Sequence, residues 1–333
     1  ARRRPQAMEE RHSRRKPGSE KPNIPKAPAI VTNRSDFKAS EMELRCAILD
    51  DYQEVALSMA DWSVLGGRVR PEAFVDHIGP AALAERLAGF DIIVAMRERT
   101  VFDAALLSRL PKLKLLITTG MANASIDTET AERLGILVCG TRGVVGPAAE
   151  LAWGLLLALM RRIPMEVANL RNSGNRWQLE VGSGLQGKTL GVVGIGKLGR
   201  LTCGYGRAFG MDVIGWSRSL TPEKSRELGI GHAATLDDLL GRSDVVCLQL
   251  KLTEETHGII GQRVIGLMRK GAILLNTARG PLVDEAALIE ALGNGKLGGA
   301  ALDVFEQEPL PPDHPFRTLP NVVATPHLGY VTE

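Results

Sequence analysis

The chain has 333 residues, of which 44% are hydrophobic and 4% aromatic, with a formal net charge of +3. This length accommodates two domains of ordinary size, and the composition is typical of an α/β protein packed with Leu, Ala and Val. The longest apolar stretch, residues 148–160, contains Glu150 and is too short to cross a bilayer, so we expect no membrane partner. The four cysteines form no C-x-x-C pair and have no metal-ligand spacing. They predict buried thiols in a reducing, cytoplasmic compartment and no metal site.

The positive charge is concentrated at the amino-terminal end. Residues 1–41 hold 11 Lys and Arg against 5 Asp and Glu, which leaves 30 against 33 in the remainder. The abundance of Pro and charge, without apolar periodicity, predicts that this segment is a disordered tail. One interpretation makes it a targeting or nucleic-acid arm. The favoured one places the natural start at Met42, because a strand pattern begins at Leu44. The body offers no basic face, so we expect no nucleic-acid partner.

Strand and helix patterns alternate through residues 42–142, which we interpret as a first, substrate-binding domain. Strands are expected at 45–50, around Phe74, and at 91–95, 113–118 and 136–139, with helices at 52–62, 81–88, 102–110 and 126–134. Such alternation predicts a parallel sheet covered on both faces, here of the flavodoxin-like type.

A long apolar helix at 147–162, with Pro147 in its first turn, is expected to bridge to a second domain over residues 143–326. This second domain is predicted to be a doubly wound, nucleotide-binding parallel sheet, with strands at 189–193, 211–216, 244–248, 272–276, 298–302 and 321–324. The predicted fold class is therefore α/β, with two Rossmann-like domains flanking a cleft. Small-molecule sites commonly lie at such domain interfaces.

A glycine-rich turn follows the strand at 189–193. Gly194 would allow a tight turn, Gly196 would let the backbone approach a pyrophosphate, and Gly199 would let helix and strand pack closely. A G-x-G-x-x-G alone is a weak signal in a chain with 36 glycines, and a chance match remains the alternative. The helix and second strand that follow complete a β-α-β unit, which favours a dinucleotide site.

The end of that second strand bears on the choice of cofactor. An acidic residue there accepts the ribose hydroxyls of NAD, whereas an Arg accommodates the 2′-phosphate of NADP. Here the residues are Ser217 and Arg218, so NADP(H) is favoured and NAD(H) remains possible. The alternative is that Arg218 is a solvated loop residue.

Three residues that follow strands of the second domain could perform hydride-transfer chemistry on a 2-keto or 2-hydroxy acid. Arg279 could hold a carboxylate with two parallel hydrogen bonds. His327, which follows Pro326, could exchange a proton near neutral pH. Glu308 could fix the tautomer of the imidazole. Each residue taken singly is more often structural, so the case rests on the constellation.

Several long motifs in order resemble those of the D-isomer-specific 2-hydroxyacid dehydrogenase family, in particular its glyoxylate/hydroxypyruvate reductases. The resemblance runs from Leu44 to Glu333 and rests on residues 119–127, 187–199, 252–256, 276–280, 301–309 and 325–329. It implies that Arg279 binds and polarises the substrate and that His327 is the acid/base, paired with Glu308. It also implies that Asp303 contacts the nicotinamide and that backbone amides near Gly120 and Met121 hold the substrate carboxylate.

On this basis the expected function is hydride transfer between NAD(P)H and a small 2-keto acid/D-2-hydroxy acid pair, in a homodimer. The predicted cofactor contacts are Gly194, Gly196, Lys197, Leu198, Gly199, Ser217, Arg218, Thr277, Ala278 and Asp303. The residues predicted to line the substrate cleft are Met96, Arg97, Arg99, Met121 and Asn123.

Two points depart from the family pattern. The acidic residue after the second strand is replaced by Ser217 and Arg218, and residues 327–333 begin a return to the first domain that relatives complete with a further helix. We therefore expect the sequence to be a fragment. The alternative function, from a different class, is an NAD(P)-sensing binding protein of the corepressor type, which would bind partners without turnover.

Overall fold

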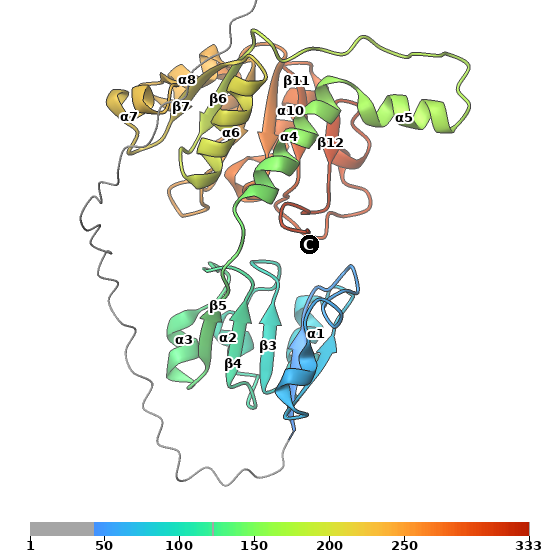
Figure 1. Ribbon diagram of the computed structural model, residues 1–333, viewed down its shortest axis with the longest axis vertical. Helices are drawn as coiled ribbons and strands as arrows, with labels where there is room; N and C mark the ends of the chain where they lie inside the picture. Colours follow the sequence, from blue (N-terminus) through green and yellow to red (C-terminus); the bar gives the residue numbers. More distant parts are fainter. Residues whose placement is uncertain (1–42, 122, 333) are drawn as a thin grey trace, which may run out of the picture. The chain divides into compact units, whose positions relative to one another are not determined.

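The computed structural model describes residues 43–121 and 123–332, which form two parallel β-sheets with helices packed against them (Figure 1). The predicted α/β fold is therefore confirmed. The tail expected over residues 1–41, together with Met42, lies outside the described residues.

The first sheet has five strands in the order β2-β1-β3-β4-β5. The strands are β1 (Leu44–Ile48), β2 (Val69–Ala73), β3 (Ile92–Ala95), β4 (Leu115–Thr118) and β5 (Leu137–Gly140), and the helices between them are η1 (Trp62–Leu65), α1 (Pro80–Leu87), α2 (Ala104–Leu107) and α3 (Thr128–Arg133). Its core includes the fully buried side chains of Leu87, Ile93, Phe102 and Leu116. The strand order reverses between β1 and β3, which is where ligands bind in flavodoxin-like sheets.

The helix expected at 52–62 is wrong, since only the short 3-10 helix η1 forms at its end. The carboxylate of Asp51 accepts the amides of Val55 (3.1 Å) and Ala56 (3.0 Å), and the Trp62 indole donates to the Ala56 carbonyl (3.1 Å). These side-chain bonds give the backbone an alternative to the helical ladder. The segment consequently folds as a series of turns beside the carboxyl end of β1.

The second sheet has seven parallel strands in the order β12-β11-β10-β9-β6-β7-β8. They are β6 (Thr189–Val193), β7 (Asp212–Trp216), β8 (Gly231–His232), β9 (Val245–Leu248), β10 (Ala272–Asn276), β11 (Leu297–Leu302) and β12 (Val322–Ala324). Their helices are α4 (Gly146–Met160), α5 (Ile163–Arg171), α6 (Lys197–Ala208), α7 (Pro222–Glu227), α8 (Leu236–Arg242), α9 (Gln262–Leu267), η2 (Gly280–Leu282), α10 (Glu285–Gly293) and η3 (Pro315–Arg317).

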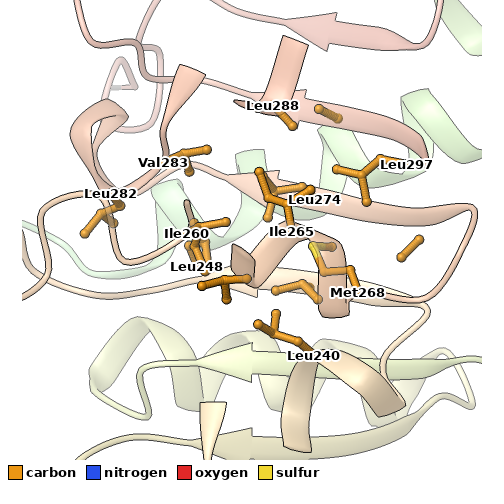
Figure 2. Packing of buried hydrophobic residues seen from close by; sticks show 14 of the residues in the cluster. Leu240, Leu248, Ile260, Ile265, Met268, Leu274, Leu282, Val283, Leu288 and Leu297 are labelled. Carbon is orange, nitrogen blue, oxygen red and sulfur yellow. The ribbon is translucent and has the colours of Figure 1, made fainter. Parts of the chain in front are cut away.

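Two apolar layers enclose this second sheet. Helices α4 and α6 pack against one face, and α8, α9 and α10 lie over the other, where Figure 2 shows side chains such as Leu240, Leu248 and Leu274 meeting. Every residue of β9 and β10 is buried, as expected for central parallel strands covered on both faces. The sheet therefore holds the loops at its carboxyl edge on a rigid base.

The prediction of four buried thiols is wrong for Cys139, which is exposed on the edge strand β5. An edge strand lacks a neighbour on one side, and three of the four β5 residues are exposed. Cys46, Cys203 and Cys247 are buried; burial raises the pKa of the first two to about 11 and that of Cys247 to about 12.

Within residues 43–121 and 123–332, no helix is long and apolar enough to cross a membrane. The same residues contain no group of three or more His, Cys, Asp or Glu side chains arranged to hold a metal ion.

Candidate active site

The turn between β6 and α6 requires glycine at two of its three motif positions. Gly194 has φ +103°, and an added Cβ would lie 2.5 Å from the Gln249 carbonyl oxygen. A Cβ on Gly199 would overlap the Gly194 carbonyl oxygen. At Gly196, by contrast, an added Cβ would meet no atom within 4 Å. The protein thus leaves open space above Gly196, where a bound phosphate would approach the backbone.

The residues around this turn fit a dinucleotide. Gly196 caps α6 without a side-chain hydrogen bond, so the amides of Lys197 and Leu198 begin a helix whose positive end is open to an anion. At the carboxyl end of β10, in the same sheet, the Thr277 hydroxyl is buried and has no hydrogen-bond partner among the described residues. Ala278 follows it and is also buried, with its amide fixed by the Asn276 side chain (3.1 Å). A buried hydroxyl without a hydrogen-bond partner costs free energy, so we expect a bound ligand to supply the partner that Thr277 lacks.

Ser217 and Arg218 follow β7, as expected. Ser217 is half-buried, whereas the Arg218 side chain is 76% exposed and lies 3.3 Å from the carboxylate of Glu255. Glu255 belongs to the 252–256 motif, and its pairing with Arg218 was not predicted from the sequence. An exposed pair of this kind is weak and readily exchanged for another partner.

His327 and Glu308 lie side by side in the structure. The imidazole Nδ1 is 2.6 Å from Glu308 Oε2, while Oε1 of the same carboxylate accepts the Phe305 amide at 3.0 Å. A carboxylate anchored in this way keeps the proton on Nδ1, because it can only accept. Nε2 therefore remains for a ligand, and both side chains are mostly shielded from solvent.

Arg279 lies at the carboxyl end of β10, where the Asn276 amide donates to its carbonyl oxygen (2.9 Å) and shapes the turn. The guanidinium Nη1 donates to the Ala278 carbonyl at 2.6 Å. Nη2 lies 2.8 and 2.7 Å from the two carboxylate oxygens of Glu98, which follows β3 of the first sheet. The guanidinium that was predicted to bind the substrate is thus paired with a carboxylate of the protein itself.

Two cavities meet at His327. One has a volume of about 990 Å³ and the other about 660 Å³, and both are lined by His77, Arg99, Phe305, Glu308 and His327. Arg279 and Glu98 line the smaller one. The predicted acid/base and the predicted substrate-binding cation therefore border the same cavity.

Arg99 connects the first sheet to the His327 loop, because its Nη2 donates to the His327 carbonyl oxygen at 3.1 Å. It lines both cavities, whereas the other four residues predicted to line the cleft line neither: Met96, Arg97, Met121 and Asn123. Arg97 instead stacks on the Tyr330 ring at 3.8 Å, and the Asn123 amide donates to the Arg97 carbonyl.

The predicted contacts of Asp303 with the nicotinamide, and of the amides near Gly120 with the substrate carboxylate, stay predictions; the structure shows which hydrogen bonds these two residues make within the protein. Asp303 is fully buried, and its carboxylate accepts the Thr325 hydroxyl (2.6 Å) and the amides of Leu328 (2.7 Å) and Gly329 (2.9 Å). It therefore organises the loop that carries His327, and burial raises its pKa. The Gly120 amide donates to the Thr141 hydroxyl (3.0 Å), so it is already satisfied. Neither Gly120 nor the exposed Met121 lines the two cavities.

Three residues close to this site have a left-handed backbone conformation, which residues other than glycine rarely adopt. They are Asp50 (φ +58°), Arg97 (φ +52°) and His327 (φ +56°), each just beyond the carboxyl end of a strand. Strain of this kind costs about 1–3 kcal/mol per residue and tends to gather at functional sites.

Sequence reasoning missed four residues that the structure brings to the site: Glu98, Asp50, Tyr52 and His77. Glu98 stands between two predicted cleft residues in a charged run directly after a strand, and that position was the available signal. Its pairing with Arg279 spans 181 residues and could not be read from spacing.

Comparison with known proteins identifies the family. Residues 153–329 match the family model described as D-isomer specific 2-hydroxyacid dehydrogenase, NAD binding domain. A glyoxylate reductase from Aeropyrum pernix is 43% identical over 239 residues, which cover 69% of this chain and 71% of that protein. A D-3-phosphoglycerate dehydrogenase from Methanocaldococcus jannaschii is 39% identical over 254 residues, covering 75% of this chain, which spans about half (48%) of that longer relative.

Comparison with solved structures leads to the same family. The crystal structure of a phosphoglycerate oxidoreductase from Vibrio cholerae has a TM-score of 0.82 and 36% identity, and the match covers 87% of this chain and 93% of that one. These relatives are named as enzymes, which supports turnover and gives no support to the binding-only alternative. The chain thus belongs to the D-isomer-specific 2-hydroxyacid dehydrogenase family, and it is an oxidoreductase that transfers a hydride between a nicotinamide cofactor and a 2-keto or 2-hydroxy acid.

Proposed function

We propose that the chain is an NADPH-dependent reductase of glyoxylate and similarly small 2-keto acids. The observation that carries this proposal is the arrangement of His327, Glu308 and Arg279 around one cavity of about 660 Å³. The name of the Aeropyrum pernix relative supports glyoxylate as the first substrate to test.

In this proposal residues 42–142 bind the substrate and residues 143–326 bind the cofactor, on the amides of Gly196, Lys197 and Leu198. When bound there, the reduced nicotinamide would supply a hydride to the keto carbon. Arg279 holds the substrate carboxylate and fixes the orientation of the keto carbon. This orientation and the stabilisation of charge together contribute most of the rate enhancement.

His327 supplies the proton that the reaction needs. As the carbonyl oxygen gains negative charge, Nε2–H of the imidazolium donates to it, and Glu308 stabilises the ring through Nδ1 (2.6 Å). Asp303 acts as a positioning residue, because its three hydrogen bonds hold the loop from Thr325 to Gly329.

The preference for NADPH rests on Ser217 and Arg218. No carboxylate stands at the end of β7 to accept ribose hydroxyls, and the exposed Arg218 can leave Glu255 for a 2′-phosphate, to which a planar guanidinium is well matched.

We further propose that the enzyme is a homodimer formed through α5 and the segment after it. Figure 1 shows this region extending away from the second sheet. Its apolar side chains are unusually exposed: Ile163 45%, Leu170 66%, Trp177 83% and Val181 97%. A second copy would bury them, as exposed apolar patches commonly mark interfaces. Light scattering should give twice the chain mass for the natural sequence and the single mass for a Leu170→Asp/Trp177→Asp variant; a monomeric parent protein would refute the proposal.

The central test is glyoxylate reduction followed by loss of NADPH absorbance. His327→Gln should lower kcat by about 10²–10⁴, the usual contribution of a general acid. His257→Gln, at an exposed histidine outside both cavities, serves as the matched control. Unchanged kcat in His327→Gln, or no oxidation of NADPH by any 2-keto acid, would refute the proposed function.

A further inference from the structure

A second polar cluster lies at the carboxyl edge of the first sheet, and the proposed mechanism does not use it. Asp50 follows β1, His77 follows β2 and Arg99 follows β3. The strand order reverses between β1 and β3, so this edge is the position where an open α/β sheet binds a ligand.

Asp50 is the buried centre of the cluster, with a relative exposure of 2%. Its Oδ1 accepts the Tyr52 hydroxyl at 3.0 Å and its Oδ2 accepts the Thr100 hydroxyl at 3.1 Å. His77 Nδ1 lies 3.5 Å from Oδ1. These contacts fix the surrounding side chains, although the Asp50 backbone is strained at φ +58°.

His77 lines both cavities with a side chain that is partly exposed. Its Nδ1 is buried and has no hydrogen bond among the described residues, while its ring lines both cavities. The nearby Asp50 carboxylate favours the tautomer with the proton on Nδ1, since a carboxylate can only accept. Nε2 is then left with a lone pair that can accept a hydrogen bond from a ligand.

Arg99 supplies a donor beside this acceptor. Its guanidinium donates to the carbonyl oxygens of Asp50 (3.3 Å) and His327 (3.1 Å) and stacks 5.0 Å from the Tyr52 ring centre. No carboxylate forms an ion pair with it in the part of the chain that the structure describes. Two of its five N–H groups are bonded to carbonyls, which leaves others for a ligand.

We propose that His77 and Arg99 form a specificity subsite for a hydroxyl group on C3 of the 2-keto acid. A hydroxyl donates one hydrogen bond and accepts others, so it matches an imidazole lone pair next to a guanidinium. This inference rests on the proposed function, since it needs a substrate held between Arg279 and His327.

The test compares kcat/KM with NADPH for three acids: glyoxylate, which has no C3; pyruvate, which has a methyl group there; and hydroxypyruvate, which has the hydroxyl. The natural chain should favour hydroxypyruvate over pyruvate about tenfold, because a site that hydrogen-bonds a hydroxyl rejects the analogue that lacks it. His77→Leu should lower the ratio of hydroxypyruvate to glyoxylate by about tenfold. His257→Leu, which places the same substitution outside both cavities, should not change that ratio.

An unchanged ratio in His77→Leu would overturn the inference. Equal use of pyruvate and hydroxypyruvate by the natural chain would overturn it as well, and this comparison decides the matter even where the variant does not fold. A preference for 3-phosphohydroxypyruvate that disappears in His77→Leu would mean that the subsite binds a phosphate group and not a hydroxyl group. Absence of activity towards all of these acids would refute the proposed function itself, whereas glyoxylate reduction without discrimination at C3 would refute only the subsite.

Discussion

The ion pair between Glu98 and Arg279 predicts that removal of a negative charge will improve substrate binding. Both oxygens of Glu98 lie within 2.8 Å of Arg279 Nη2, and the two side chains are 21% and 28% exposed. A substrate carboxylate needs the same guanidinium, so it must first displace Glu98. Glu98→Gln keeps the shape of the side chain, removes its charge and should lower KM for glyoxylate.

The magnitude follows from the strength of the bond that is lost. Hydrogen bonds between charged groups contribute about 1.5–3 kcal/mol. The partial exposure of both groups, and the amide oxygen that Gln retains as an acceptor, reduce this to about 1–2 kcal/mol. We therefore expect KM to fall about 5–30-fold, with kcat nearly unchanged, in steady-state assays that follow NADPH absorbance over a range of glyoxylate concentrations.

Two variants control for other effects of charge. Glu98→Asp retains the negative charge and should not lower KM. Glu306→Gln removes a carboxylate from the same cavity. Glu306 forms no hydrogen bond or ion pair with Arg279 among the described residues, so this variant reports the general effect of cavity charge. A rise in KM, or a fall in kcat, for Glu98→Gln would refute the reasoning and would mean that Glu98 orients Arg279 for the substrate.

Three further predictions concern the cofactor site and the thiols. Gly199→Ala should lower the melting temperature by several degrees, because the added Cβ overlaps backbone atoms. Gly196→Ala should leave the melting temperature of the free protein nearly unchanged and instead abolish the stabilisation that NADPH gives. Equal melting temperatures for the two variants would contradict this. Arg218→Ala should raise KM for NADPH far more than for NADH, and Glu255→Gln should lower KM for NADPH, because the competing carboxylate is gone; equal effects on both cofactors would remove the case for NADPH. Iodoacetamide at pH 8 should modify the folded protein only at Cys139 among its four cysteines, because burial raises the pKa of the other three to about 11–12; mass spectrometry showing a second modified cysteine would contradict it.

The sequence predicted best where local chemistry and fold agree. The strand, glycine turn and helix from Thr189 to Ala208 were identified because the motif spacing itself carries the signal: Gly194 and Gly199 are required sterically, and Gly196 leaves room for a phosphate. The region 52–62 failed because hydrogen bonds from the Asp51 side chain compete with the helix, and their geometry is not visible in a hydrophobic pattern.

The candidate site was predicted only in part, for a different reason. Arg279, Glu308 and His327 each follow a strand of one sheet, and parallel strands bring their carboxyl ends to a common edge. Glu98 and Arg99 come from the other sheet, and their contacts with Arg279 and His327 span 181 and 228 residues. Such contacts depend on how the two sheets meet, which no periodicity within either sheet encodes.

The left-handed backbone at Asp50, Arg97 and His327 limits which substitutions can stabilise this enzyme. Glycine adopts that conformation without strain, which costs other residues about 1–3 kcal/mol. Asp50→Gly, however, would remove the buried carboxylate that accepts the Tyr52 and Thr100 hydroxyls, and Arg97→Gly would remove the guanidinium that stacks on the Tyr330 ring. Relief of strain at either position therefore comes with the loss of contacts that the present side chain makes.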